Sequence, residues 1–277
     1  MGQEQPTLQQ LLNSPGIKRR FEEILDSAAP SFISSILTIV SNNAKLKECS
    51  PNSILSAAGV AAALRLPINP SLGFAHIVPY KSKNGTQAQF QLGHRGFIQL
   101  ALRSGQYRTL NAGAVCEGQI AEIDFVTGEI VRGAKSSDNV VGYVAYMELI
   151  NGFKKSLYMT VEELQAHAEK YSQSYAYDLR SGKKSSVWSA NFDAMAKKTV
   201  LKKLLSNFGI ISIDQQSAAL ATALQADHAV VNEKGFLYVD NERGEEKVVP
   251  FTDVIELPSD DSPNEELPED NPPTDAD

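Results

Sequence analysis

Residues 185–208 read SSVWSANFDAMAKKTVLKKLLSNF, and this stretch favours a helix because it is rich in Ala, Leu and Lys and contains neither Pro nor Gly. On an ideal helix at about 100° per residue, Lys198 and Lys202 share one face with large apolar side chains, while Lys197 and Lys203 lie on its two flanks. A solvated surface helix normally separates its charges from its apolar stripe. Two interpretations remain open. The helix packs inside while its lysines meet an external polyanion such as phosphate, or it is a surface helix whose lysine stems cover the core.

The composition is that of a folded soluble protein. The chain has 277 residues, 42% hydrophobic and 21% charged, enough for one substantial core or two small ones. No run of 18 apolar residues is present, and the N-terminus lacks the basic and apolar regions of a secretory signal, so we expect neither a membrane span nor export. Two isolated cysteines are too few for a disulfide framework. We therefore expect a cytoplasmic protein.

The two signs of charge are segregated along the chain. Residues 240–277 hold 14 acids against two bases, whereas residues 1–239 have a net charge of +5. Six of the 13 prolines also lie beyond residue 239. High acidity, many prolines and a single aromatic residue predict a disordered tail there.

Periodicity and turn signals predict an α+β fold. N-terminal helices precede a central antiparallel sheet whose β-hairpins pack on helices. A hairpin is predicted around Lys83-Asn84-Gly85, a second at Asn151-Gly152, and a capping box at Thr160. The expected helices are 17–25, 31–46, 52–65, 94–105, 160–171, 185–208 and 214–227, the expected strands are 74–82, 86–93, 107–117, 120–132, 140–149 and 153–159, and residues 172–186 are expected to form a polar loop. Gly59, amid small residues, suggests close helix packing.

Signatures of enzymes are mostly absent. Gly182-Lys183-Lys184-Ser185 faintly resembles a phosphate-binding loop, but the upstream Gly position is Tyr177 and no strand precedes it. The four histidines are scattered, without a His or Cys pair at zinc spacing. Glu117, Glu122 and Asp124 lie on a strand and turn, where solvated positions are favoured over metal ligands. We predict no enzymatic activity, no metal and no cofactor.

A binding surface for a single-stranded nucleic acid is the remaining interpretation. Such binding needs cations for phosphates and flat groups for bases. Basic residues occur at the first hairpin tip, around residues 95–108, in the 180–184 loop and on the lysine-rich helix. Aromatic residues interleave with them, although each is equally compatible with the core: Tyr80, Phe90, Phe97, Tyr107, Tyr175, Tyr177 and Trp188.

Two long blocks carry a resemblance to a known family. NPSLGFAHIVPYKSKNGTQAQFQLGHRGFIQLALRSGQY (69–107) and WSANFDAMAKKTVLKKLL (188–205) resemble the RecT family of phage and prophage single-strand annealing recombinases, in matching order. The likeness runs from about residue 57 to residue 213. It implies a fold related to Redβ and to eukaryotic annealing proteins.

The resemblance also implies a function. Members of this family anneal complementary strands without ATP, bind single-stranded DNA without sequence specificity, and form rings or helical filaments on DNA. It implies a phage 5′–3′ exonuclease and the host single-strand-binding protein as partners, in the cytoplasm of a bacterial host. The alternative function is passive binding and protection of single-stranded DNA. On this basis we divide the chain into a helical oligomerisation region (1–50), a DNA-binding and annealing core (51–239) and an acidic disordered tail (240–277).

Ten residues are the predicted DNA contacts. Phosphate contacts are expected first from the lysine-rich helix, and then from the hairpin and the segment that follows it. Two aromatic residues are weaker candidates for base or sugar contacts, and for Trp188 a core role is at least as well supported. In that order they are Lys197, Lys198, Lys202 and Lys203; Lys81, Lys83, Arg95 and Arg103; Tyr107 and Trp188.

Two further segments have open interpretations. The basic cluster Lys18-Arg19-Arg20 is a solvated face, or it touches nucleic acid or a neighbouring subunit. The acidic tail docks on a recombination partner, or competes with DNA as a polyanion, or keeps the protein soluble.

Overall fold

A computed structural model describes residues 6–82, 85–209, 215–227, 229–232, 235–238 and 247–249. Helices and strands alternate in one chain, and the α+β expectation is confirmed. The α-helices are α1 (Leu8–Asn13), α2 (Pro15–Leu25), α3 (Ala29–Ser41), α4 (Ala44–Lys47), α5 (Pro51–Ala63), α6 (His94–Arg103), α7 (Val161–Tyr171), α8 (Gln173–Ser181), α9 (Val187–Ala190), α10 (Phe192–Phe208) and α11 (Gln215–Ala226). The strands are β1 (Ala75–Ser82), β2 (Gly85–Leu92), β3 (Tyr107–Cys116), β4 (Ile120–Ile123), β5 (Ile130–Arg132), β6 (Val140–Leu149), β7 (Lys154–Thr160), β8 (Ala229–Asn232), β9 (Gly235–Tyr238) and β10 (Lys247–Val249).

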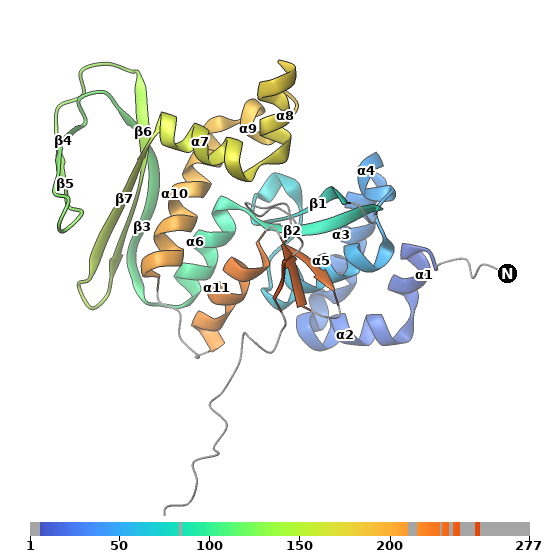
Figure 1. Ribbon diagram of the computed structural model, residues 1–277. Helices are drawn as coiled ribbons and strands as arrows, with labels where there is room; N and C mark the ends of the chain where they lie inside the picture. Colours follow the sequence, from blue (N-terminus) through green and yellow to red (C-terminus); the bar gives the residue numbers. More distant parts are fainter. Residues whose placement is uncertain are drawn as a thin grey trace, which may run out of the picture.

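Two groups of elements flank the middle of the molecule (Figure 1). On one side, the antiparallel sheet β3-β6-β7 packs against α10, and the small hairpin β4–β5 extends beyond that sheet. On the other side, α1 to α5 gather around the hairpin β1–β2, and the sheet β8-β9-β10 joins them through contacts of β8 with β2 and α5. Helices α6 and α11 lie between the two groups and contact each other.

Strands β1 and β2 pair as an antiparallel hairpin, as predicted. The register pairs Ser82 with Gly85 and Ala75 with Leu92, and residues 83 and 84 lie outside the described residues. Strand β2 buries the side chains of Ala88, Phe90 and Leu92. The hairpin is thereby anchored in the core along one face.

The lysine-rich stretch is two helices instead of one. Asn191 ends α9 and caps α10, because its side-chain oxygen accepts a hydrogen bond from the backbone N–H of Ala194 at 3.2 Å. Helix α10 buries Ala196, Val200 and Leu204 completely. Packing against the β3-β6-β7 sheet on one side and α6 on another explains why this helix has no clean polar face.

The expected polar loop at 172–186 is wrong in its first half, because residues 173–181 form α8. The Ser172 hydroxyl accepts a hydrogen bond from the backbone N–H of Tyr175, and Gly182 ends the helix in the left-handed conformation (φ 67°). The expected helix over 31–46 is likewise interrupted at Asn42 and Asn43. Strand β10 lies inside the predicted tail, so paired structure reaches at least to Val249.

One stretch, Pro15–Ser41, is long and apolar enough by composition to cross a membrane, which differs from the expectation drawn from the sequence. It is not one rod. A short 3-10 helix (Asp26–Ala28) separates α2 from α3, and Asp26 has a positive φ of 52°. The rings of Phe21 and Phe32 lie 5.8 Å apart, whereas eleven residues of straight helix span about 16 Å. The stretch therefore folds back into two helices of 11 and 13 residues, each shorter than the roughly 20 residues that a span needs.

Candidate nucleic-acid interface

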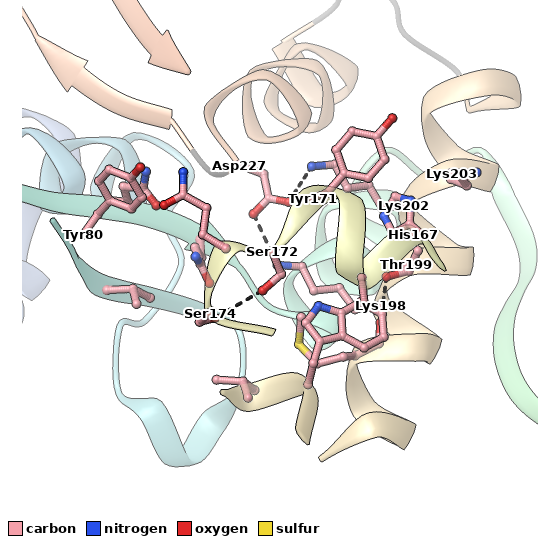
Figure 2. A pocket seen from close by; sticks show the side chains of 18 of the residues that line it. Tyr80, His167, Tyr171, Ser172, Ser174, Lys198, Thr199, Lys202, Lys203 and Asp227 are labelled. Atoms are coloured by element: carbon pink, nitrogen blue, oxygen red, sulfur yellow. Dashed lines mark hydrogen bonds and ion pairs between the residues drawn. The ribbon is translucent and has the colours of Figure 1, made fainter. Parts of the chain in front are cut away.

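A groove of about 690 Å³ runs between the hairpin β1–β2 and helices α7 and α10 (Figure 2). Strands β1 and β2 contribute Tyr80, Gln89 and Gln91 to one wall. The opposite wall comes from the end of α7, the start of α8 and one side of α10, and the end of α11 closes the base. Residues far apart in the sequence thus meet around one open channel.

The base of the groove holds a buried carboxylate between two lysines (Figure 2). Asp227 has a side chain with no exposed surface, and its two oxygens lie 3.4 Å from Lys198 Nζ and 2.8 Å from Lys202 Nζ. Oδ1 also accepts a hydrogen bond from the backbone N–H of Leu92 at 2.8 Å. One acid therefore ties β2, α10 and α11 together, and sequence reasoning had not singled it out.

Burial changes the chemistry of Lys198. Its side chain is 10% exposed, and desolvation lowers the pKa of its ammonium, while the carboxylate of Asp227 opposes that shift and Lys202 adds to it. Lys202 is more open, with 32% of its side chain exposed. These two lysines thus sit on the predicted face, but both are paired with Asp227, and a direct phosphate contact by either stays a prediction.

Lys203 is the cation of α10 that points into open space. It is exposed, lines the groove, and forms no ion pair with any residue that the structure describes. The groove continues past His167 into a shallower recess that Lys170 and Lys203 both line. Burial, and then the nearby charges of Lys203, Lys202 and Lys170, lower the pKa of His167 from 6.5 to about 4. This part of the groove therefore gathers lysine side chains around an imidazole that is uncharged at neutral pH.

A buried donor in the groove has no partner among the described residues. Gln89 is 2% exposed, lines the groove from β2, and its Nε2 forms no hydrogen bond within the described part of the chain. An unpaired buried amide is costly, and this one lies behind the wall of the groove with almost no exposed surface. The β-strand pattern alone gave no signal for this residue.

Aromatic side chains line the groove, and one of them, Tyr171, was not among the aromatic candidates drawn from the sequence. Tyr171 at the end of α7 is 41% exposed. Its ring is tilted by 42° against that of His167, with centroids 4.6 Å apart, and Lys170 Nζ lies 5.3 Å from its ring centre. Tyr80 is half-buried on the opposite wall. A capping-box helix was predicted to end at Tyr171, but nothing in the sequence indicated that its last turn borders the groove.

Asp178 shapes the segment between α8 and α10. It is 2% exposed, and its carboxylate accepts hydrogen bonds from the backbone N–H groups of Ser185 and Ser186 and from the hydroxyls of Ser185 and Ser189, at 2.7–2.9 Å. Although burial opposes it, these hydrogen bonds hold the pKa of Asp178 well below its usual range. The carboxylate fixes the chain just before Trp188 and so sets where α9 meets the groove.

Three of the predicted DNA contacts are held in place by contacts within the protein. Arg103 donates to the carbonyl oxygens of Leu64 at 2.7 Å and Arg65 at 3.0 Å, which caps the end of α5. Tyr107 is 7% exposed and belongs to the main core. Trp188 is 6% exposed and packs edge-on against Phe192 with ring centroids 5.5 Å apart, although it also lines the groove. Phe90 and Phe97 are fully buried, which agrees with a core role.

Two other predicted cations, Arg95 and Lys197, lie outside the groove. Arg95 is exposed at the start of α6 and donates weakly to the carbonyl of Leu72, and Lys197 pairs with Asp193 at 2.8 Å. Both lie near His94, whose pKa is lowered by burial first and then by Lys197 and Arg95. Lys81 lies in β1 opposite Thr86, and Lys83 falls outside the described residues. The candidates that the structure places do not form one cluster. Four line the groove, Arg95 and Lys197 lie near His94, Arg103 caps the end of α5, and Tyr107 lies in the core.

The sequence was compared with a family model and with two related proteins. The RecT family model matches residues 30–236, a range that contains every residue lining the groove. The uncharacterized protein YqaK of Bacillus subtilis (strain 168) is 43% identical over 220 residues, which cover 79% of this chain and 72% of that protein. Protein RecT of Escherichia coli (strain K12) is 28% identical over 216 residues, which cover 75% of this chain and 77% of that protein.

Proposed function

The chain belongs to the RecT family, which implies single-strand annealing in DNA recombination, and from this premise we propose that it pairs complementary DNA strands without ATP by holding one of them in the groove. The observation that carries the assignment to the groove is the meeting of Lys202 and Lys203 of α10 with Tyr80 and Gln89 of the hairpin on its facing walls. Binding is proposed to be independent of sequence, and the protein to act as a scaffold without a catalytic step.

The charges of the groove suit a phosphate backbone. Lys203, Lys170 and Lys202 line its open side, and each cation that neutralises a phosphate releases condensed counterions, which drives binding. The amide of Gln89 on the opposite wall is buried, and its side chain would have to turn toward the groove to donate to a phosphate or sugar oxygen. Such contacts position a strand and read no sequence.

The aromatic groups supply the second requirement of single-strand binding. Tyr171 offers an exposed ring at the rim, with Lys170 above it. Stacking of a base on such a ring is tolerant of sequence because every base has a flat face. With phosphates held inward, the remaining bases stay available to a second strand, and a match is then stabilised by base pairing itself.

Membership of the RecT family implies that the protein self-assembles. We propose that the assemblies are rings or helical filaments on DNA and that they also bind the annealed duplex intermediate. The finer partners that we propose are a phage 5′–3′ exonuclease that exposes single strands and the host single-strand-binding protein. The site of action that we propose is the cytoplasm of a bacterial host, with a phage or prophage gene as the source.

The test is annealing of two dye-labelled complementary oligonucleotides by the wild-type protein without any nucleotide. Annealing much faster than the spontaneous reaction, with both strands intact when Mg²⁺ is added, supports the proposal. Binding that slows annealing would identify a passive protecting protein, and shortened strands would identify a nuclease. Either result would overturn the proposed function.

A further inference from the structure

The hairpin β4–β5 ends in an apolar tip that nothing in the described chain covers. Phe125 is 95% exposed and Val126 is 74% exposed at the turn, and Val131 on β5 is 49% exposed. Isolated apolar residues on a surface are ordinary, but Phe125 and Val126 are adjacent in the chain and both are exposed at one turn, which makes this tip a candidate interaction site. We refer to residues 117–138, which contain this hairpin, as the arm.

The tip is held in shape before any partner arrives. The carboxylate of Asp124 accepts hydrogen bonds from the backbone N–H of Val126 at 2.8 Å and of Thr127 at 3.3 Å. Lys155 of β7 donates to the carbonyl oxygen of Thr127 at 2.7 Å, which fastens the turn to the neighbouring sheet. A fixed apolar tip loses little conformational entropy on binding, and such preorganisation favours association.

The arm is acidic. It contains five acids and two bases, and one of the bases, Lys135, is already paired with Asp138. The acids are Glu117, Glu122, Asp124, Glu129 and Asp138. This charge disfavours the phosphates of DNA, so the tip fits a protein surface that is apolar and bordered by bases.

Such a surface lies on the N-terminal helices. Helix α3 carries no charged side chain, and Ile33, Leu37 and Val40 recur at helical spacing along one side of it. These three side chains pack against the core and leave only part of their surface exposed. Helix α2, which contacts α3, carries Lys18-Arg19-Arg20, and none of these three residues forms an ion pair with a described residue. We refer to this side of α3 together with the basic cluster of α2 as the helix face.

The arm and the helix face lie at opposite ends of the molecule, with the groove between them (Figure 1). Two complementary patches that are far apart on one chain cannot meet within it, but they can join successive copies head to tail. Such a contact between non-equivalent surfaces generates rings or open filaments, and it would bring the grooves of successive copies into one track.

We propose that the arm of one copy of this chain docks on the helix face of the next copy, with Phe125 and Val126 against Ile33 and Leu37 and the acids of the arm beside Lys18-Arg19-Arg20. The proposal rests on the self-assembly that the proposed function includes, and it names the surfaces that produce it.

The first test removes the apolar tip. Phe125→Ser should weaken self-association of the full-length protein about tenfold or more, measured by sedimentation velocity with and without an oligonucleotide, because the burial of one large aromatic side chain is lost. Leu102→Ser is the matched control, since Leu102 is a 54% exposed residue of α6 outside both surfaces, and it should leave assembly unchanged. Unaltered assembly of Phe125→Ser, or a wild type that never assembles, would overturn the proposal.

The second test distinguishes a head-to-tail contact from contact between two arms. Ser34→Glu adds a charge at an exposed position of α3, beside the apolar side, and should also abolish assembly by repelling the acidic arm. Each variant retains one intact surface, so an equimolar mixture of Phe125→Ser and Ser34→Glu should form dimers and nothing larger. If Ser34→Glu assembles alone like the wild type, the helix face is not the partner of the arm and the proposal fails.

These outcomes are separable from the proposed function. Oligomer size reports on the two surfaces, whereas annealing by the wild type reports on the groove. If the wild type anneals DNA but both variants assemble as it does, this inference alone is overturned. If the wild type does not anneal DNA but both variants lose assembly, the proposed function alone is overturned.

Discussion

Asp227 makes the lysines of the groove part of the fold as well as part of the proposed site. Its fully buried carboxylate is placed between Lys198 and Lys202, and it also accepts the N–H of Leu92. A buried charge that loses its partners is far more costly than a pair that is removed together. Substitutions in this trio therefore report on stability before they report on DNA.

We predict that Lys198→Ala/Lys202→Ala lowers the free energy of unfolding by about 3–5 kcal/mol, because Asp227 loses both ammonium groups. Urea denaturation followed by circular dichroism measures this loss. Adding Asp227→Asn to the double variant should restore part of the stability, and Lys203→Ala should change it by less than about 0.5 kcal/mol. An unchanged midpoint for the double variant would show that the carboxylate does not depend on these lysines.

The imidazole of His167 predicts a pH dependence of DNA binding. Burial and the charges of Lys203, Lys202 and Lys170 lower the pKa of His167 to about 4, so the free protein keeps this group neutral at pH 7. Phosphates in the groove offset those cations and raise the pKa, so binding takes up a proton. Affinity for single-stranded DNA should then rise as pH falls from about 7 to about 5.

Fluorescence anisotropy with a labelled oligonucleotide at several pH values measures that slope. His167→Gln should flatten it, whereas His94→Gln should not, because His94 also has a lowered pKa but lies outside the groove. The stability of the free protein should depend on pH in the opposite direction. Its stability falls as pH drops from 6.5 toward 4, because the unfolded chain protonates His167 first. If DNA affinity depends on pH in the same way for both variants and the wild type, His167 does not take part in DNA binding.

At the scale of elements, two glycines of the quoted sequence block serve backbone packing. A Cβ added to Gly96 of α6 would lie 2.2 Å from the carbonyl oxygen of Phe74, and one added to Gly93 would lie 2.1 Å from that of Gly73. Helix α6 thus rests directly on the chain that enters β1. Gly59 of α5 is different, because an added Cβ meets no described atom within 4 Å, which corrects the expectation of close packing there.

These two helix glycines should respond to alanine with opposite signs. We predict that Gly96→Ala destabilises the protein by about 1–3 kcal/mol through overpacking, while Gly59→Ala stabilises it by about 0.5–1 kcal/mol through helix propensity. Denaturant midpoints of both variants measure the difference. Two shifts of the same sign would contradict the packing described for α6.

Local signals in the sequence predicted most elements near the groove but not the contacts between them. The pairing of β1 with β2 and the capping box at Thr160 depend on neighbouring residues, and both are confirmed. Helix α8 was missed because its residues are polar and its Ser172 and Gly182 caps resemble loop chemistry. The pairing of Lys202 with Asp227 joins residues 25 positions apart, and no periodicity within α10 reveals it.

At the scale of the whole molecule, the segregation of charge is the main long-range feature. Residues 250–277 carry ten acids and no base, so the net charge changes from −7 to +3 without them. A deletion from residue 240 would also remove β10, which pairs with β9. A truncation after Val249 therefore tests the tail more cleanly.

We predict that this truncation raises affinity for single-stranded DNA at low salt, and that the gain shrinks as salt increases, because the acidic segment no longer repels or competes with phosphates. Anisotropy titrations at about 50 mM and about 300 mM NaCl measure both effects. Equal affinities at low salt would contradict competition and leave partner docking or solubility as the role of the tail.

The central claim is that the groove accelerates annealing through its exposed cations. The most direct measurement is the rate of annealing of two dye-labelled complementary oligonucleotides, without nucleotide, by wild type, by Lys170→Ala/Lys203→Ala and by a control, Lys45→Ala/Lys154→Ala, whose two exposed lysines lie outside the groove. We expect the groove variant to anneal about tenfold more slowly, with the salt dependence of its binding reduced by about 1.4 in log–log slope, and the control to match wild type. Equal rates for the two variants would contradict the account.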